Sequence, residues 1–247
     1  MPCLPTKLSV ARAASSKGKK KSRFRLWKAA VWALAFLLLF PFLQVLAVRY
    51  IDPPLTPPML LSRMHFRSGH RPAVPYRWTD LEKVSPWFLK AVWQTEDARF
   101  FSHNGFDWIE LDHAVANAQR TGKPPRGAST ITMQCARSLF LWQGRSWLRK
   151  PIEAYYTILL ETMLTKRRIF ELYVNVIEFG EGLYGIEAAA QHYWHLPAQE
   201  LDREKAALLT AILPNPQARD PLQPSEVVRA KTLLVIRKLA QSPRWPL

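Results

Sequence analysis

The feature that most constrains this chain is a run of twenty residues without a charge, "AAVWALAFLLLFPFLQVLAV", at 29–48. An α-helix of that length spans about 30 Å, which is the thickness of the hydrocarbon core of a bilayer. Nine Lys and Arg residues and no acid precede the run, in residues 1–28. Segments with such an excess of positive charge stay in the cytoplasm. We therefore predict one transmembrane anchor, a cytoplasmic N-terminus, and export of everything after Arg49.

A cleaved signal peptide is the alternative, because it too has a basic start and an apolar middle. Its apolar core is usually shorter, about 7–15 residues, and a small-x-small cleavage site follows it. Here the run is longer and no clear site of that kind follows. We favour the uncleaved anchor.

Composition excludes several classes of protein. The hydrophobic content of 48% excludes a disordered chain. The net charge of +16 would suggest nucleic acid, but nine of the positive residues lie in the short tail, so we expect no nucleic-acid partner. The two cysteines, Cys3 and Cys135, would lie on opposite sides of the membrane and cannot form an intrachain disulfide. We find no metal-type Cys/His spacing, no Gly-rich phosphate loop and no internal repeat.

Residues 51–75 contain six prolines and little periodicity, which is typical of a linker or an extended arm. From Tyr76 onward the pattern is helical, so we predict a mostly α domain with one core. We divide the chain into a basic tail 1–28, an anchor 29–48, a Pro-rich linker 49–75 and an exported domain 76–247.

Capping signals place the helices of that domain. Ser85 with Pro86 starts one helix, Asp107 with Glu110 starts a second, and Gly122 ends the second. We predict helices at about 86–97, 108–120, 130–141 (capped by Ser129), from Pro151, from after Thr165 to near Ile177, and at about 185–195, 202–213 and 225–240.

The segment "AVWQTEDARFFSHNGFDW", 91–108, is the first candidate site. Leu89, Val92 and Trp93 form an apolar stripe of the helix, and Glu96 continues that stripe. Desolvation makes a carboxylate more basic, which suits a general base. The alternative is a glutamate at a frayed helix end that faces solvent or pairs with Arg99.

The neighbours of Glu96 favour structural roles. We predict Asp97 to be a hydrogen-bond acceptor within the fold and Asp107 to be a helix cap. His103 could be catalytic, but a lone His in a turn is more often a scaffold residue.

Two later segments carry polar groups that suit a phosphate. In "RGASTITMQCARSLFLW", Thr130, Gln134 and Arg137 form a polar stripe after a basic loop with Lys123 and Arg126, and a helix N-terminus beside cations suits an anion. A solvent-facing stripe is the alternative. The segment "RSWLRKPIEAYY" supplies Arg149, Lys150 and Glu153, for which a surface ion pair is the default. Together with the anchor, these segments suggest a reaction on a membrane-bound sugar phosphate.

These motifs resemble the monofunctional biosynthetic peptidoglycan transglycosylases, which share glycosyltransferase family 51 with the transglycosylase domain of class A penicillin-binding proteins. The resemblance covers about Ser85 to Pro216. It is carried, in family order, by "EDARFFSHNGFD", "GASTITMQCARSLF", "RKPIE", "KRRIFELYVNVIEFGEGLYGIEAAAQHYW" and "EKAALLTAILPNP".

The resemblance implies a mostly α, lysozyme-like domain with a lobe dipping into the membrane. It implies an enzyme that polymerises lipid II: the 4-hydroxyl of an acceptor GlcNAc attacks the lipid-linked MurNAc of the growing chain, with inversion and release of undecaprenyl pyrophosphate. The location implied is the inner membrane, single-pass, with the catalytic domain in the periplasm. Partners could include cell-wall synthesis or division proteins. No cofactor is required, and a divalent cation, Mg²⁺ or Mn²⁺, is compatible with the site.

By motif position, Glu96 matches the general base and Glu153 the second acid, which organises the cations and pyrophosphate. Substrate-region positions are matched by Asp97, Phe100, His103, Thr130, Gln134, Arg137, Arg149 and Lys150, of which the first three shape the surroundings of the base. The family commonly has Lys-Asn where this chain has Arg137 and Ser138, and often Gln at Met133. Arg retains the charge but changes the donor geometry.

Two rival functions remain. A lysozyme-like lytic enzyme would share the fold and a catalytic Glu, but not the cations that a pyrophosphate leaving group needs. A membrane-anchored binding or assembly protein would have lost its active site, whereas Glu96 and Glu153 are both present.

Overall fold

Helices make up nearly all of the regular structure of this protein. The structure is a computed structural model that describes residues 8–65, 74–123, 128–142, 144, 146–241 and 245–246. Parts of the predicted tail (1–7) and linker (66–73), and Arg126 of the predicted phosphate loop, lie outside the described residues. The chain divides into two units, Met1–Ala47 and Val48–Leu247, and each is described by itself.

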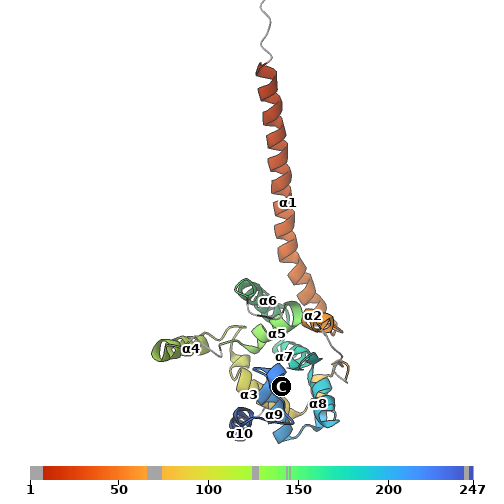
Figure 1. The fold of residues 1–247 in the computed structure, drawn as a ribbon, viewed down its shortest axis with the longest axis vertical. Coiled ribbons are helices and arrows are strands. Elements are labelled where there is room, and N and C mark those ends of the chain that lie inside the picture. Colours follow the sequence, from red (N-terminus) through yellow and green to blue (C-terminus); the bar gives the residue numbers. More distant parts are fainter. Residues whose placement is uncertain are drawn as a thin grey trace, which may run out of the picture. The chain divides into compact units, whose positions relative to one another are not determined.

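The first unit contains most of helix α1 (Leu8–Tyr50), whose last residues belong to the second unit (Figure 1). Among the described residues, Trp27–Tyr50 is the stretch that is long and apolar enough to cross a bilayer, with a mean hydropathy of 2.4. The sequence therefore predicts this helix correctly. Its helical conformation also extends back into the basic tail.

The segment predicted to be an extended arm is partly folded onto the second unit. Pro57–His65 form helix α2, which packs against α5 (Ile131–Phe140), and Met59 is buried. Prolines suggested a linker, but Pro57 stands at the start of the helix, where its missing N–H costs nothing. Arg168 also donates hydrogen bonds to the carbonyl oxygens of Val48 and Ile51, within the same unit. The expectation of an extended arm is therefore wrong for these residues.

The second unit is a helical domain with one short hairpin. After α2 its helices and strands are α3 (Pro86–Glu96), α4 (Trp108–Thr121), α5 (Ile131–Phe140), α6 (Arg149–Met163), α7 (Lys166–Val176), β1 (Glu178–Gly180), β2 (Leu183–Tyr184), α8 (Ile186–Trp194), α9 (Arg203–Ile212) and α10 (Glu226–Gln241), with 3-10 turns at Leu81–Lys83, Phe100–Ser102, Ala198–Glu200 and Pro216–Ala218. This agrees with the predicted mostly α domain.

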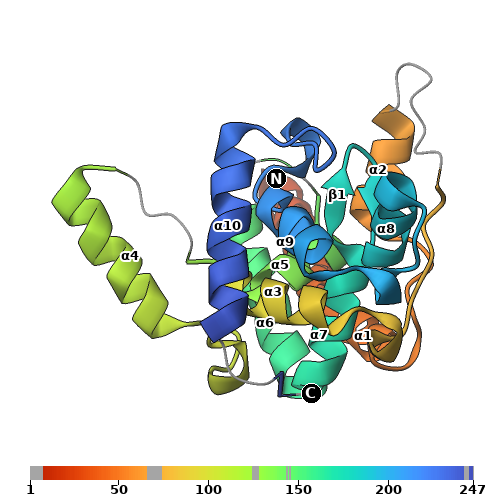
Figure 2. The ribbon, with the colours of Figure 1, turned by 90° about the horizontal axis from the view of Figure 1, so that it is seen from below.

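Helix α7 is the centre of this unit. Seven of the eight residues from Ile169 to Val176 are buried, all but Glu171. A helical segment that is buried on nearly all of its faces must be covered by other elements on those faces. It packs against α5, which also packs against α6, while α3, α9 and α10 pack on one another (Figures 1 and 2). The candidate site lies where α3, α5 and α7 meet.

The caps and starts of the helices agree with the sequence in three places and differ in three. Asp107 caps α4 by accepting from the backbone N–H of Ile109 and Glu110, Gly122 ends α4 in the left-handed conformation, and Thr165 caps α7. The Ser85 hydroxyl makes no cap, because it donates to the carbonyl oxygen of Leu201. Helix α5 is capped by Thr130 instead of Ser129, and α6 starts at Arg149 instead of Pro151.

Two features have no counterpart in the predictions. The hairpin β1–β2 pairs Glu178 with Tyr184 and Gly180 with Leu183 across a register shift. Its strands are too short to show an alternating pattern. Helix α4 contains no buried residue, and Figure 2 shows it projecting from the rest of the unit.

Candidate active site

Six of the ten predicted site residues line two pockets, and Phe100, His103, Lys150 and Glu153 line neither of them. The acidic pocket, of about 180 Å³, is lined by Gln94, Thr95, Glu96, Asp97, Ala98, Arg99, Asp107, Glu110, Ala128, Ser129, Thr130 and Lys238. The cation pocket, of about 310 Å³, is lined by Pro58, Gln134, Arg137, Ser138, Gly144, Arg149, Tyr173, Ile177, Glu178, Tyr184, Leu213, Pro214 and Pro216. Glu96 therefore lines one pocket, and the guanidinium groups of Arg137 and Arg149 line the other.

Glu96 is the last residue of α3 and stands in the acidic pocket. Its helical spacing predicts a buried carboxylate, and the structure shows a half-buried one. Gln134 Nε2 donates to its Oε2 over 3.2 Å. The position suits a base, because the carboxylate is shielded on one side and open to a substrate on the other.

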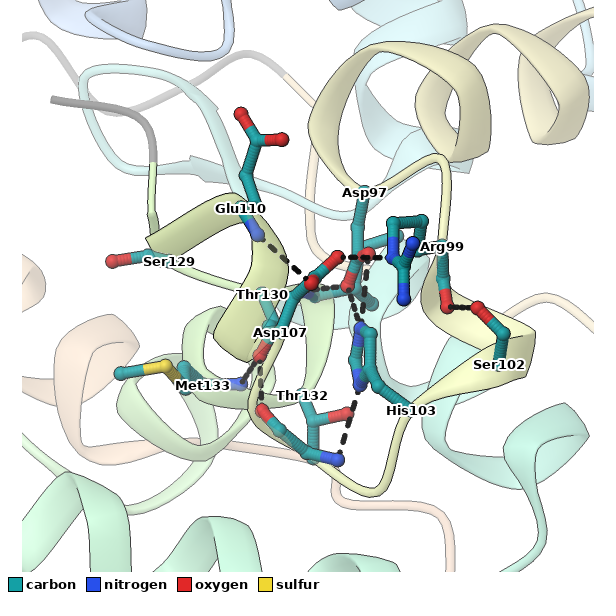
Figure 3. A network of polar contacts seen from close by, with 12 residues as sticks. Asp97, Arg99, Ser102, His103, Asp107, Glu110, Ser129, Thr130, Thr132 and Met133 are labelled. Carbon is teal, nitrogen blue, oxygen red and sulfur yellow. Dashed lines mark hydrogen bonds and ion pairs between the residues drawn. The ribbon is translucent and has the colours of Figure 1, made fainter. Parts of the chain in front are cut away.

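Asp97, the residue after Glu96, forms a structural network with His103 (Figure 3). The backbone N–H of Gly105 donates to His103 Nδ1 over 3.1 Å, so this nitrogen carries the lone pair and Nε2 carries the hydrogen. His103 Nε2 lies 3.0 Å from both carboxylate oxygens of Asp97, and the backbone N–H of Ile131 donates to Asp97 Oδ2 over 2.9 Å. The scaffold interpretation of both residues agrees with these contacts.

Phe100 and Thr130 also support the site from within the fold. Phe100 is fully buried and contacts Phe101 and Phe170. The Thr130 hydroxyl donates to the carbonyl oxygen of Gly105 over 2.6 Å and accepts from the backbone N–H of Met133 (Figure 3). These contacts tie the start of α5 to the turn that follows Asp97.

Gly105 should be the most sensitive backbone position of this network. Its φ is +90°, and an added Cβ would lie 2.8 Å from Thr157 Cγ2. We expect Gly105→Ala to destabilise the protein by about 2 kcal/mol or more, because backbone strain and a close contact add. Gly122→Ala is the matched control: its φ is +65° but nothing lies within 4 Å, so roughly 1 kcal/mol is expected. Thermal unfolding of the two variants measures the difference, and equal losses would contradict the close contact at Gly105.

The cation pocket is built by α5, α6 and α7. Arg137 comes from α5 and Arg149 from the start of α6. Arg149 Nη1 donates to the carbonyl oxygens of Trp142, over 3.2 Å, and Gly144. Burial lowers the pKa of the Arg149 guanidinium, the charge of Arg137 lowers it further, and Glu153 opposes both. Two like charges that face one pocket favour an anion between them.

Glu153 is fully buried and lies next to the cations Arg149 and Lys150. Lys150 Nζ donates to its Oε1 over 2.9 Å, while Arg149 Nε lies 3.7 Å from its Oε2, too far for a hydrogen bond. Arg149 Nε and Glu153 Oε2 consequently have no hydrogen-bond partner in the described part of the chain. Arg149, Lys150 and Glu153 of "RKPIE" are thus brought together as the sequence predicts, around a buried carboxylate and not as an isolated surface ion pair, although the Lys150 side chain itself is exposed.

Gln134 joins the two pockets. It lines the cation pocket, and its side chain reaches Glu96 of the acidic pocket. The Tyr173 hydroxyl donates to Gln134 Oε1 over 3.1 Å. An acid, an amide and a phenol from three helices therefore form one hydrogen-bonded chain.

Comparison with known proteins decides the family. The family model described as Transglycosylase matches residues 68–240. The chain belongs to this family. Among its relatives, a protein of Xanthomonas campestris pv. campestris strain B100, named biosynthetic peptidoglycan transglycosylase, is 43% identical over 216 residues, which cover 85% of this chain and 87% of the relative. Proteins of the same name from Shigella boydii serotype 4 strain Sb227 and Escherichia coli O9:H4 strain HS are 46% identical over 164 residues, 66% of this chain and 68% of each relative.

This transglycosylase has site residues that the sequence patterns do not reveal. Tyr173 is hidden among the apolar residues of α7, and Pro58 comes from the presumed linker. Lys231 of α10 is half-buried, and burial lowers the pKa of its ammonium group. The charge of Glu96 raises this pKa, and the charges of Arg219 and Lys238 lower it further. Only the tertiary structure shows that these residues belong to the site, because each lies far along the chain from Glu96.

One group of side chains in the transglycosylase has the composition of a metal site. Ligand atoms of Asp97, His103 and Asp107 lie within 4.8 Å of one another. Asp97 and His103 are committed to the network described above, and Asp107 caps α4 and pairs with Arg99 Nε over 3.0 Å. A cation there would displace these hydrogen bonds and face a guanidinium, so these residues do not fit a resident metal.

Proposed function

We propose that this transglycosylase polymerises the glycan chains of peptidoglycan from lipid II. In the proposed reaction the 4-hydroxyl of an acceptor GlcNAc attacks the anomeric carbon of the lipid-linked MurNAc, with inversion. The new bond forms as the bond from the anomeric carbon to the phosphate oxygen breaks, and its electron pair leaves with undecaprenyl pyrophosphate. The names of the relatives support the substrate class.

The observation that carries this proposal is the placing of Glu96 and of the Arg137–Arg149 pair on either side of Gln134. A hydroxyl nucleophile needs one base, and Glu96 would accept its proton. A pyrophosphate leaving group needs its growing negative charge neutralised more than it needs a proton. Glu96 in one pocket and the guanidinium groups of Arg137 and Arg149 in the other would satisfy both needs.

The remaining predicted residues would serve the leaving group. Arg137 and Arg149 would contact the phosphates directly, with Lys150, whose side chain is 54% exposed, as a further cation. Glu153 would hold Arg149 and Lys150 in place, since a fully buried carboxylate that ion-pairs with two neighbouring cations limits where they can point. Each of these groups acts on charge, and none needs to donate a proton.

The experiment that tests the function is incubation of the detergent-solubilised protein with lipid II alone, followed by separation of polymer from monomer. We expect glycan polymer and free undecaprenyl pyrophosphate. A lytic enzyme would instead shorten preformed glycan and leave lipid II unchanged, and a binding protein would retain lipid II without converting it. Either of these outcomes would overturn the proposal.

We also propose that the protein sits in the inner membrane with residues 1–28 in the cytoplasm and the catalytic domain in the periplasm. The helix Trp27–Tyr50 supports an anchor, and the nine basic residues before it support the orientation. A reporter that is active only outside the cytoplasm, fused after Leu247, should be active in intact cells. An intact but inactive fusion would contradict this orientation, and a fusion to the cytoplasmic end serves as the control.

We propose that no resident metal takes part. A divalent cation, Mg²⁺ or Mn²⁺, would then enter only as a counter-ion of the substrate pyrophosphate. In that case EDTA should reduce polymerisation at low lipid II concentration and have little effect at saturation. A complete loss of activity at saturation would contradict this proposal.

A further inference from the structure

Tyr173 of α7 lines the cation pocket. Its side chain is 1% exposed, although its hydroxyl lies next to polar groups of the site. That hydroxyl donates to Gln134 Oε1 over 3.1 Å, and the other end of the same amide donates to Glu96 over 3.2 Å. A buried phenol is thus connected to the candidate base through one side chain.

The hydrogen bond from the Tyr173 hydroxyl determines which end of the Gln134 amide faces Glu96. A carboxylate accepts hydrogen bonds and a primary amide offers both a donor end and an acceptor end. With the Tyr173 O–H at the carbonyl end of Gln134, the NH₂ end must face the carboxylate. If Gln134 were flipped, its oxygen would face Glu96 and the two acceptors would repel.

The Tyr173 hydroxyl stays protonated, and so remains a hydrogen-bond donor, at physiological pH. Burial raises the pKa of the Tyr173 phenol well above its usual value, and the charge of Glu96 contributes to the rise. The hydroxyl therefore keeps its hydrogen and can always donate to Gln134. The contact is not one that titration switches off.

The contact also leaves part of the base available. Gln134 binds Glu96 Oε2, while Oε1 accepts no hydrogen bond from any residue in the described ranges. One oxygen is therefore held by Gln134, and the other carries no such bond in a residue that lines the acidic pocket. Proton transfer is fastest when the accepting atom is held in line with the donor.

We propose that Tyr173 is a positioning residue for the general base, acting on Glu96 through Gln134. The inference rests on the proposed function, in which Glu96 accepts the proton of the acceptor hydroxyl. It assigns Gln134 to the orientation of the base, in addition to its place in the wall of the cation pocket. Tyr173 lines the cation pocket, and in this proposal its hydroxyl acts on the base through Gln134.

The test is a double-mutant cycle in the full-length, detergent-solubilised enzyme, with kcat and KM measured for lipid II. Tyr173→Phe should lower kcat about threefold to tenfold, the effect of one hydrogen bond, and change KM less than about twofold. Gln134→Met removes both hydrogen bonds that connect Tyr173 to Glu96, and it should lower kcat at least as much as Tyr173→Phe does. In the Gln134→Met background, adding Tyr173→Phe should lower kcat by less than about twofold, because its only route to Glu96 is gone.

Tyr193→Phe is the matched control. Its hydroxyl donates to the carbonyl oxygen of Phe179 over 2.9 Å, so this variant loses one hydrogen bond of the same kind, outside both pockets. We expect parental kcat for it. If Tyr173→Phe acts only through general loosening of the core, it will lower kcat by the same factor with and without Gln134, and the inference is overturned.

Other outcomes separate this inference from the proposed function. If the parental enzyme polymerises lipid II and Tyr173→Phe has the parental kcat, Tyr173 does not position the base while the function stands. If Tyr173→Phe fails to fold, Gln134→Met alone decides: an unchanged kcat in that variant overturns the inference. If the parental enzyme itself makes no polymer, the proposed function fails first and the positioning role fails with it.

Discussion

Replacing Glu96 with Gln should lower lipid II polymerisation by about 10²–10⁴-fold while leaving the domain folded. The amide has the volume of the carboxylate and fits the half-buried end of α3, but it cannot accept the proton of the attacking hydroxyl. The initial rate of polymer formation measures the loss. Thermal unfolding of the same sample shows whether the fold is intact.

The control for this prediction is Glu226→Gln. Glu226 is an exposed carboxylate at the start of α10, so the substitution makes the same chemical change away from both pockets. Its rate should equal that of the parental enzyme. A folded Glu96→Gln protein that polymerised lipid II at the parental rate would show that Glu96 is not the base.

Removing one guanidinium of the cation pocket should lower kcat by about 10²–10³-fold, the size found when one preorganised donor to a developing negative charge is lost. We expect this for Arg137→Ala and for Arg149→Ala. Binding of the lipid tail should change little, because it depends on apolar contacts. The two losses should not add in the double variant, since both side chains line the same pocket and would act on the same phosphates.

Two further variants sharpen this prediction. Arg137→Lys keeps the positive charge and should retain most of the activity. Arg149→Ala also leaves the fully buried Glu153 with one cation fewer, so its thermal stability must be measured beside its rate. The exposed Arg229 is the control for loss of a surface charge. Parental turnover in folded Arg137→Ala and Arg149→Ala would place the pyrophosphate site elsewhere.

The parts of this protein that could be predicted from sequence depend on short-range interactions. A helix cap involves residues within three positions, as Asp107 and Glu110 show, and a helical period repeats within four. For this reason most helix boundaries were predicted to within one or two residues. One error, Thr130 in place of Ser129, arises because two neighbours could both cap the same helix. Helix α2 was missed because its prolines are equally typical of a linker.

The chemistry of individual residues was also accessible from sequence. The position of Glu96 at the end of an apolar stripe predicted that it is a candidate base. The spacing of Arg149, Lys150 and Glu153 predicted a charged cluster. Motif order identified the family. What these patterns left open was whether each polar group faces a substrate, solvent or another side chain.

Only the tertiary structure settles that question. Glu96 and Gln134 are 38 residues apart, and Gln134 and Tyr173 are 39 apart. No local pattern specifies such pairs, because the tertiary fold brings the end of α3 to α5, which packs on α7. The same packing buries Phe100 and leaves Glu96 partly open. By itself the sequence determined most of the helices, the long apolar N-terminal helix among them, and the reactive residue types, since these depend on composition and neighbours a few positions away. The fold alone decided which of those residues meet, because a hydrogen bond needs two atoms within about 3.5 Å of each other, however far apart they lie along the chain.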